Sequence, residues 1–201
     1  MPVSIPKYGG GWMDDWKIDI HNEVYLTQWN KEWARTFHLE KQGIIGSMIA
    51  EDHYGAVYHV GSTSIEGMVA KPIIDILVCP NDDVPVEDVI PDLERIGYKN
   101  LGDGGRPGSY FLSSGDKPNE TFYVHLCHEG NQVAQDQLLF QKIERTNPVI
   151  CSKYALLKTL LWDLFPDDRA TYSALKGLFI EGVLTAYRQA SGENNGKGEY
   201  I

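Results

Sequence analysis

Residues 59–78, with the sequence HVGSTSIEGMVAKPIIDILV, contain two apolar runs separated by a polar loop. The first run leads into Gly61 and the hydroxyl-bearing residues 62–64, a glycine turn whose backbone N–H groups are free to face an anion. The second run, residues 73–78, is typical of a buried central strand, and Asp75 is its only charged residue. The stretch therefore predicts a strand, a phosphate-binding loop and a second strand that carries one carboxylate.

Asp75 is the first candidate site residue. A lone carboxylate in an apolar strand is costly to bury unless a cation or hydrogen-bond donors satisfy it. We therefore expect Asp75 to lie at a strand end that faces a site, as a metal ligand or another polar-site residue.

These residues resemble the signature of the GrpB-like family, a branch of the nucleotidyltransferase superfold, and the resemblance extends over residues 24–188. The matching positions are His59, Gly61, Ser62, Thr63, Ser64, Ile65, Gly67, Ala70, Lys71, Pro72, Ile74 and Asp75, while Glu66 replaces the usual proline. The resemblance implies an α+β fold: a single domain with a mixed nucleotidyltransferase-like sheet flanked by helices, and a helical C-terminal part.

Leu77 is the departure that bears most on chemistry. In the superfold, a second carboxylate two residues after the first shares the metal ions, and Leu77 stands at that position here. One carboxylate does not make the clamp of a two-metal site. We therefore expect that the chain is not a standard two-metal nucleotidyltransferase.

Composition excludes several classes of protein. With 201 residues and 42% hydrophobic residues, the chain is long enough to bury a sizeable core. The net charge of −10 argues against generic DNA binding. The sequence has neither a secretory leader nor an apolar run long enough to span a membrane, and its three widely spaced cysteines are typical of reduced thiols. We therefore expect a cytoplasmic protein.

The chain divides into three parts. Residues 1–22 lack clear periodicity and are expected to form an irregular N-terminal arm. Residues 23–188 form the predicted GrpB-like domain. Residues 189–201, rich in Gly, Asn and Glu, are predicted to be a disordered tail.

His125 lies in a second predicted strand, residues 122–127, whose alternation places Tyr123, His125 and Cys127 on one face. A near-neutral pKa suits His125 to act as a general base or as a ligand. A hydrogen-bonded strand histidine is an equal alternative. Zinc binding by His125, Cys127 and His128 is disfavoured, because His128 faces the other way and a fourth ligand is missing.

From residue 131 onward, apolar residues recur at helical spacing and predict three helices. Here too the sequence resembles the family, although Gln141 and Lys142 stand where its members usually carry Arg and Asp. Lys158 and Lys176 are candidates to neutralise a phosphate. The alternative for both lysines is an ordinary solvated helix face.

The leading hypothesis is a pocket for a phosphate-bearing ligand, such as a nucleotide, a coenzyme or the acceptor end of a tRNA, with Mg²⁺ as cofactor and group transfer as the implied reaction. The predicted catalytic residues are Asp75 and His125, and the predicted ligand-binding residues are His59, Gly61, Ser62, Thr63, Lys71, Lys158 and Lys176. Two alternatives are a tRNA-dependent aminoacyl or peptide-forming transferase on the same fold, and a non-catalytic nucleotide-binding or interaction module.

Overall fold

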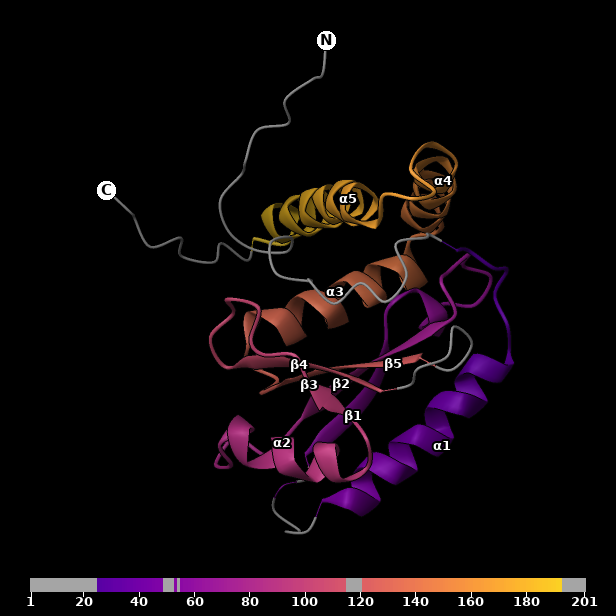
Figure 1. Cartoon of the computed structure of the whole chain (residues 1–201). Helices are drawn as coiled ribbons and strands as arrows, with labels where there is room; N and C mark the ends of the chain where they lie inside the picture. The colour runs from indigo at the N-terminus through magenta and orange to yellow at the C-terminus, as the bar shows by residue number, and fades with distance from the viewer. Residues whose placement is uncertain (1–24, 49–52, 54, 115–120, 193–201) are drawn as a thin grey trace.

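A computed structural model describes residues 25–48, 53, 55–114 and 121–192. The predicted arm at residues 1–22 and residues 193–201 of the predicted tail lie outside this range. The described chain forms one sheet with helices on both faces, as Figure 1 shows with α1 and α2 below the sheet and α3, α4 and α5 above it. The prediction of an α+β fold with a helical C-terminal part is confirmed.

The sheet has five strands in the order β1-β2-β5-β4-β3. Their bounds are Ala56–Val60 for β1, Ile73–Cys79 for β2, Lys99–Asn100 for β3, Ser109–Ser114 for β4 and Thr121–Cys127 for β5. β2 and β5 are parallel, and the other neighbouring pairs are antiparallel. The sheet is therefore mixed, and its two central strands are the ones predicted to carry Asp75 and His125.

Five helices cover the sheet. They are α1 (Glu32–Ser47), α2 (Val86–Arg95), α3 (Gln132–Thr146), α4 (Pro148–Leu164) and α5 (Arg169–Ala190). Each of the last three begins at a side-chain cap, since Asn131, Asn147 and Asp168 accept hydrogen bonds from backbone N–H groups of the first turn. Each of the three predicted C-terminal helices therefore begins at a residue whose side chain caps it, and α5 extends to Ala190.

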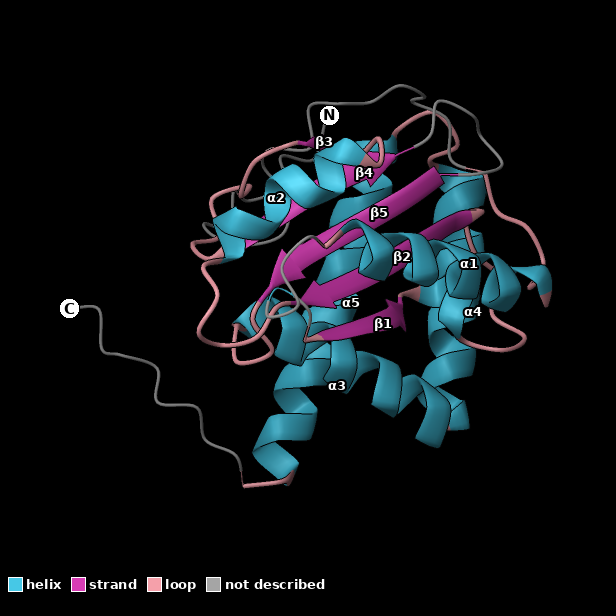
Figure 2. Cartoon of the chain, turned by 90° about the horizontal axis from the view of Figure 1, so that it is seen from below, coloured by secondary structure: helices cyan, strands magenta, loops and turns pink. Residues whose placement is uncertain are grey.

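β2 is apolar along most of its length because both of its faces are covered. Ile74, Ile76 and Val78 join the core formed with α1 and α2, the side that faces the viewer in Figure 2. Leu77 packs against Val133 of α3 on the other face. Because side chains alternate along a strand, Asp75 lies on the same face as Leu77, beneath the C-terminal helices.

Other global features bear on the predicted class. Among the helices of the described residues, none combines the length and apolar character that a membrane crossing needs. Cys79, Cys127 and Cys151 are free thiols, and the first two are buried.

Candidate functional site

The predicted phosphate loop folds as Gly61 followed by the short 3₁₀ helix η2 (Ser62–Ser64). Gly61 has φ 67° and ψ −175°, a region almost exclusive to glycine. A Cβ at this position would lie 2.4 Å from Asp75 Oδ2. The loop backbone therefore packs directly on the Asp75 carboxylate, an approach that only glycine permits.

Hydrogen bonds within the loop and from Gln141 of α3 hold the loop in place. Ser64 Oγ donates to the Gly61 carbonyl at 2.7 Å. Gln141 Nε2 donates to Ser64 Oγ at 2.6 Å and to the His59 carbonyl at 2.5 Å. Gln141, which the sequence marked only as a departure from the family pattern, thus fixes the loop to the helical layer.

Asp75 and His125, the two predicted catalytic residues, lie close together on neighbouring strands. β2 and β5 are parallel, and Asp75 stands in register with Tyr123. His125 Nε2 is 3.8 Å from Asp75 Oδ1, and the side chains are 14% and 29% exposed, respectively. Phe111 of β4 contacts the rings of His125 and Tyr123, with centroids 5.3 and 5.0 Å away. The Asp75–His125 pair is thus partly exposed to solvent and lies beside the aromatic rings of Phe111 and Tyr123.

Lys158 reaches from α4 to the loop. Its Nζ donates to Ser62 Oγ at 2.9 Å and also to the Val69 carbonyl, and it lies 4.7 Å from the centroid of the Tyr154 ring. The residue is only 2% exposed. Burial, together with repulsion from Lys176, lowers the pKa of the Lys158 ammonium to about 7. This lysine is therefore not on a solvated helix face.

Lys176 approaches the same region from α5. Its Nζ lies 5.8 Å from the centroid of the Tyr172 ring, and Lys71 Nζ lies 5.0 Å from the same ring. Burial lowers the pKa of the Lys176 ammonium, whereas the Asp75 carboxylate acts in the opposite direction. Arg169, at the start of α5, donates to Tyr123 Oη at 3.0 Å. We call Lys71, Lys158, Arg169 and Lys176 the basic cluster.

Glu144 of α3 is a buried acid that the sequence did not single out. Burial raises the pKa of its carboxyl to about 7, although Lys158 and Lys176 favour the charged form. Its Oε1 is buried and makes no hydrogen bond within the described part of the chain. Glu144 is therefore a weakened counter-charge to Lys158 and Lys176.

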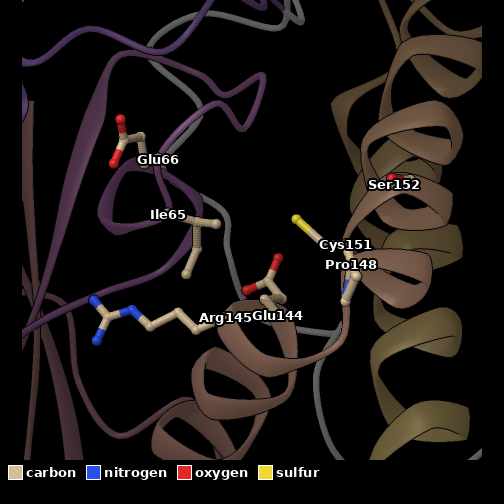
Figure 3. A pocket seen from close by; sticks show the side chains of 7 residues that line it. All are labelled: Ile65, Glu66, Glu144, Arg145, Pro148, Cys151 and Ser152. Atoms are coloured by element: carbon tan, nitrogen blue, oxygen red, sulfur yellow. The ribbon is translucent and has the colours of Figure 1, made fainter.

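Glu144 also lines a cavity of about 300 Å³ beside the basic cluster. Figure 3 shows its carboxylate directed into the space between Ile65 and Cys151, whereas Arg145 points away. The lining residues are Ile65, Glu66, Glu144, Arg145, Pro148, Cys151 and Ser152. The cavity is separate from the partly exposed Asp75–His125 pair.

His59 and Thr63 lie apart from the basic cluster. The His59 ring stacks on Phe37 of α1 with a centroid separation of 4.7 Å, and its Nε2 is 3.0 Å from Thr63 Oγ1. Burial lowers the pKa of His59 to about 4, so the ring is neutral near pH 7. These two predicted ligand-binding residues hold the loop on its α1 side, and their role toward a ligand stays a prediction.

The residues around Asp75 do not fit a preformed magnesium site. Mg²⁺ prefers several oxygen ligands in octahedral geometry, but the charges that act from the helices near Asp75 include the ammonium groups of Lys158 and Lys176. Within the described residues, no group of three or more His, Cys, Asp or Glu side chains is placed to hold a metal ion. Leu77 is fully buried in the core at the expected second carboxylate position. Binding of Mg²⁺ at Asp75 stays a prediction.

The fold and the site together define an α+β protein in which three C-terminal helices bring basic side chains to a glycine loop on a mixed sheet. Residues 23–186 match the family described as GrpB protein. The chain belongs to this family, and the resemblance seen in residues 59–75 is confirmed.

Individual relatives agree with this assignment. UPF0157 protein YqkA of Bacillus subtilis is 33% identical over 181 residues, which cover 89% of this chain and 52% of that protein. The chain thus spans about half the length of YqkA. Glutamate-rich protein GrpB of Alkalihalophilus pseudofirmus is 30% identical over 170 residues, covering 81% of this chain and 94% of that protein. The crystal structure of conserved protein GrpB from Enterococcus faecalis superposes with a TM-score of 0.69 at 32% identity, covering 81% of this chain and 99% of that one.

Proposed function

We propose that the chain binds a phosphate-bearing ligand over the η2 loop and the Asp75–His125 pair, and transfers a group at that phosphate. The observation that carries this proposal is the convergence of Lys158 and Lys176, from two different helices, on one loop and one carboxylate. Both ammonium groups are desolvated in a protein whose net charge is −10.

Desolvated cations favour an anion. The acids that act on Lys158 and Lys176 are Asp75 and the weakened Glu144. The lowered pKa values of Lys158 and Lys176 mean that their charge is under-compensated without a ligand. A phosphate would supply the missing negative charge and accept charge-assisted hydrogen bonds from these groups.

The loop adds donors that need little rearrangement. Ser62 Oγ already contacts Lys158 Nζ, so one phosphate oxygen can take both as partners if it displaces their mutual bond. The Tyr172 ring makes cation–π contacts with the ammonium groups of both Lys71 and Lys176. Such pre-organisation lowers the entropy lost on binding.

The chemistry follows from the charges. Group transfer at phosphorus requires stabilisation of the charge on the phosphoryl oxygens and a base for the acceptor. The basic cluster supplies the first. His125 supplies the second, because its Nε2 lies 3.8 Å from Asp75 Oδ1, and the carboxylate stabilises the imidazolium that forms when the ring takes a proton.

Isothermal titration calorimetry tests the binding step. Sulfate, pyrophosphate, ATP, coenzyme A and a tRNA acceptor stem are each titrated with and without Mg²⁺, using the full chain and its Lys176→Met and Lys158→Met variants. We expect each substitution to weaken binding by about 10- to 100-fold, because a charge-assisted hydrogen bond contributes about 1.5–3 kcal/mol. The matched control is Lys153→Met, which removes an exposed lysine from the same helix as Lys158.

The proposal is wrong if none of these anions binds, or if Lys176→Met and Lys153→Met have equal effects. Transfer is tested separately by incubating the chain with each bound ligand and candidate acceptors, followed by mass analysis. Product that is lost in His125→Asn, with binding retained, supports the base. Binding without any product leaves the site as a receptor and refutes the transfer step.

A further inference from the structure

Helix α4 carries an apolar stripe on the face that points away from the protein core. Val149, Leu156, Leu160 and Leu164 are 59%, 60%, 48% and 68% exposed. The three leucines follow each other at intervals of four residues, so they lie along one side of the helix. Tyr154, Lys158 and Leu161 are the buried residues of the same helix and belong to its opposite side.

Such a stripe is unusual on a surface that stays in water. Exposed apolar side chains scattered singly need no explanation, but a contiguous row marks an interaction surface. Figure 1 shows α4 at one end of the helical layer, where the outward side of the helix faces no other labelled element. Among the described residues, the stripe is therefore exposed on the outer side of the helical layer.

The charges beside the stripe indicate which partner fits. Lys153 and Asp163 are both exposed, and they lie on either side of Leu156 and Leu160 along the helix. Along the helix axis, residue 158 lies midway between Leu156 and Leu160 and also midway between Lys153 and Asp163. At a rise of 1.5 Å per residue, Lys153 and Asp163 each lie about 7.5 Å along the axis from the level of residue 158. A second α4 laid antiparallel about this level places Leu156 opposite Leu160 and Lys153 opposite Asp163.

We propose that the chain forms a twofold-symmetric homodimer in which the outward faces of two α4 helices pack antiparallel. Leu156 and Leu160 of both copies form the apolar centre, and two symmetry-related Lys153–Asp163 pairs flank it. A C₂ interface requires one self-complementary surface, and this face has the required arrangement. The contact is small, at the low end of interface sizes, so we expect a dissociation constant on the order of 10 μM.

Sedimentation equilibrium of the full chain, from about 5 to 500 μM, measures the association. The mass should rise with concentration from that of the 22.6 kDa monomer toward twice that value. Leu160→Asp should weaken association by more than tenfold, because it places a carboxylate at the centre of the apolar contact. Leu39→Asp is the matched control, since Leu39 is an exposed leucine on α1, away from the stripe, and its substitution should leave association unchanged.

Charge exchange tests the antiparallel register. Lys153→Asp alone and Asp163→Lys alone should each weaken self-association by about three- to tenfold, because each places like charges opposite one another. The double variant should restore it. A mixture of the two single variants should form heterodimers in preference to either homodimer, since every pair is then complementary.

Several outcomes overturn the proposal. If the full chain is a monomer at every concentration, the stripe has a different occupant, such as the residues that precede Tyr25 or another protein. A dimer that Leu160→Asp leaves unchanged uses another surface. If the single variants weaken association but neither the double variant nor the mixture recovers it, the antiparallel register is wrong.

Discussion

Gly61→Ala is the substitution that most directly tests how the loop and the carboxylate are coupled. The added methyl group meets two obstacles. The backbone of Gly61 has φ 67° and ψ −175°, which an L-residue rarely adopts, and the new Cβ would lie 2.4 Å from Asp75 Oδ2 and 3.0 Å from Asp75 Cγ. Either the loop or Asp75 must move.

The two effects have separate magnitudes. A residue held in a sparsely populated region of φ and ψ costs about 1–3 kcal/mol. An extra methyl group in a packed site costs about another 1–3 kcal/mol through displaced neighbours. We therefore expect Gly61→Ala to lower the free energy of unfolding by about 2–6 kcal/mol, which is a large part of the stability of a typical domain.

Urea denaturation followed by circular dichroism measures the change, and a control separates the two effects. Gly67 also has a positive φ, of 79°, but a Cβ there meets no atom within 4 Å. Gly67→Ala should therefore cost only the backbone contribution. When Asp75→Ala is added to Gly61→Ala, the double variant should be about 1–2 kcal/mol more stable than the sum of the two single effects predicts, because the clashing carboxylate is gone. The recovery is partial because the Cβ of residue 75, which alanine retains, would still lie 3.0 Å from the new Cβ at position 61.

The reasoning is refuted if Gly61→Ala costs no more than Gly67→Ala, or if the effects of Gly61→Ala and Asp75→Ala add. Ligand binding supplies a second readout. Because the displaced loop carries Ser62, Gly61→Ala should weaken sulfate binding even under conditions where the variant remains folded. Gly67→Ala should bind sulfate as the unmodified chain does.

Two further predictions follow from buried charges. Sulfate affinity should fall by up to tenfold per pH unit as the pH rises above about 7, because the pKa of Lys158 is about 7 without a ligand and the bound anion favours its protonated form. Calorimetry from pH 6 to 9 checks this, and the affinity of Lys158→Met for sulfate should depend less steeply on pH. Asp92→Ala should lower the free energy of unfolding by about 1–3 kcal/mol in urea denaturation, because the buried Asp92 carboxylate joins Arg95, at 2.7 Å, to His53, at 2.9 Å; a change below about 0.5 kcal/mol would contradict this.

Much of the sheet was predictable from the sequence because its signals are local. The apolar run at residues 73–78 with one acid indicated a central strand, and the alternation at residues 122–127 placed Tyr123 and His125 on one face. Once both strands lie side by side in a sheet, Asp75 and His125 become neighbours. The glycine turn between two strands was predicted, whereas its close approach to Asp75 was not.

The helical half of the site was less predictable, because it depends on how distant elements pack. Lys158 and Lys176 carry the same periodicity signals as any solvated lysine, and only the packing of α4 and α5 over the sheet buries their ammonium groups. Glu144 resembles an ordinary helix acid in sequence. His59 shows the converse: its position in the motif indicated a ligand contact, but the alternation of β1 turns its ring toward Phe37.

The absence of a carboxylate at Leu77 is consistent with the presence of Lys158 and Lys176 on the same face of the sheet. A carboxylate at position 77 would be buried among Val60, Cys127 and Val133, where it would have no donor to offset its desolvation. The same face instead receives positive charge from helices that follow in the chain, as ammonium groups fixed to α4 and α5. A metal ion supplies positive charge that depends on its concentration, whereas a lysine supplies charge that depends on pH. The site should therefore respond to acidity near pH 7 more strongly than to divalent ions, because Lys158 and Glu144 both have pKa values of about 7.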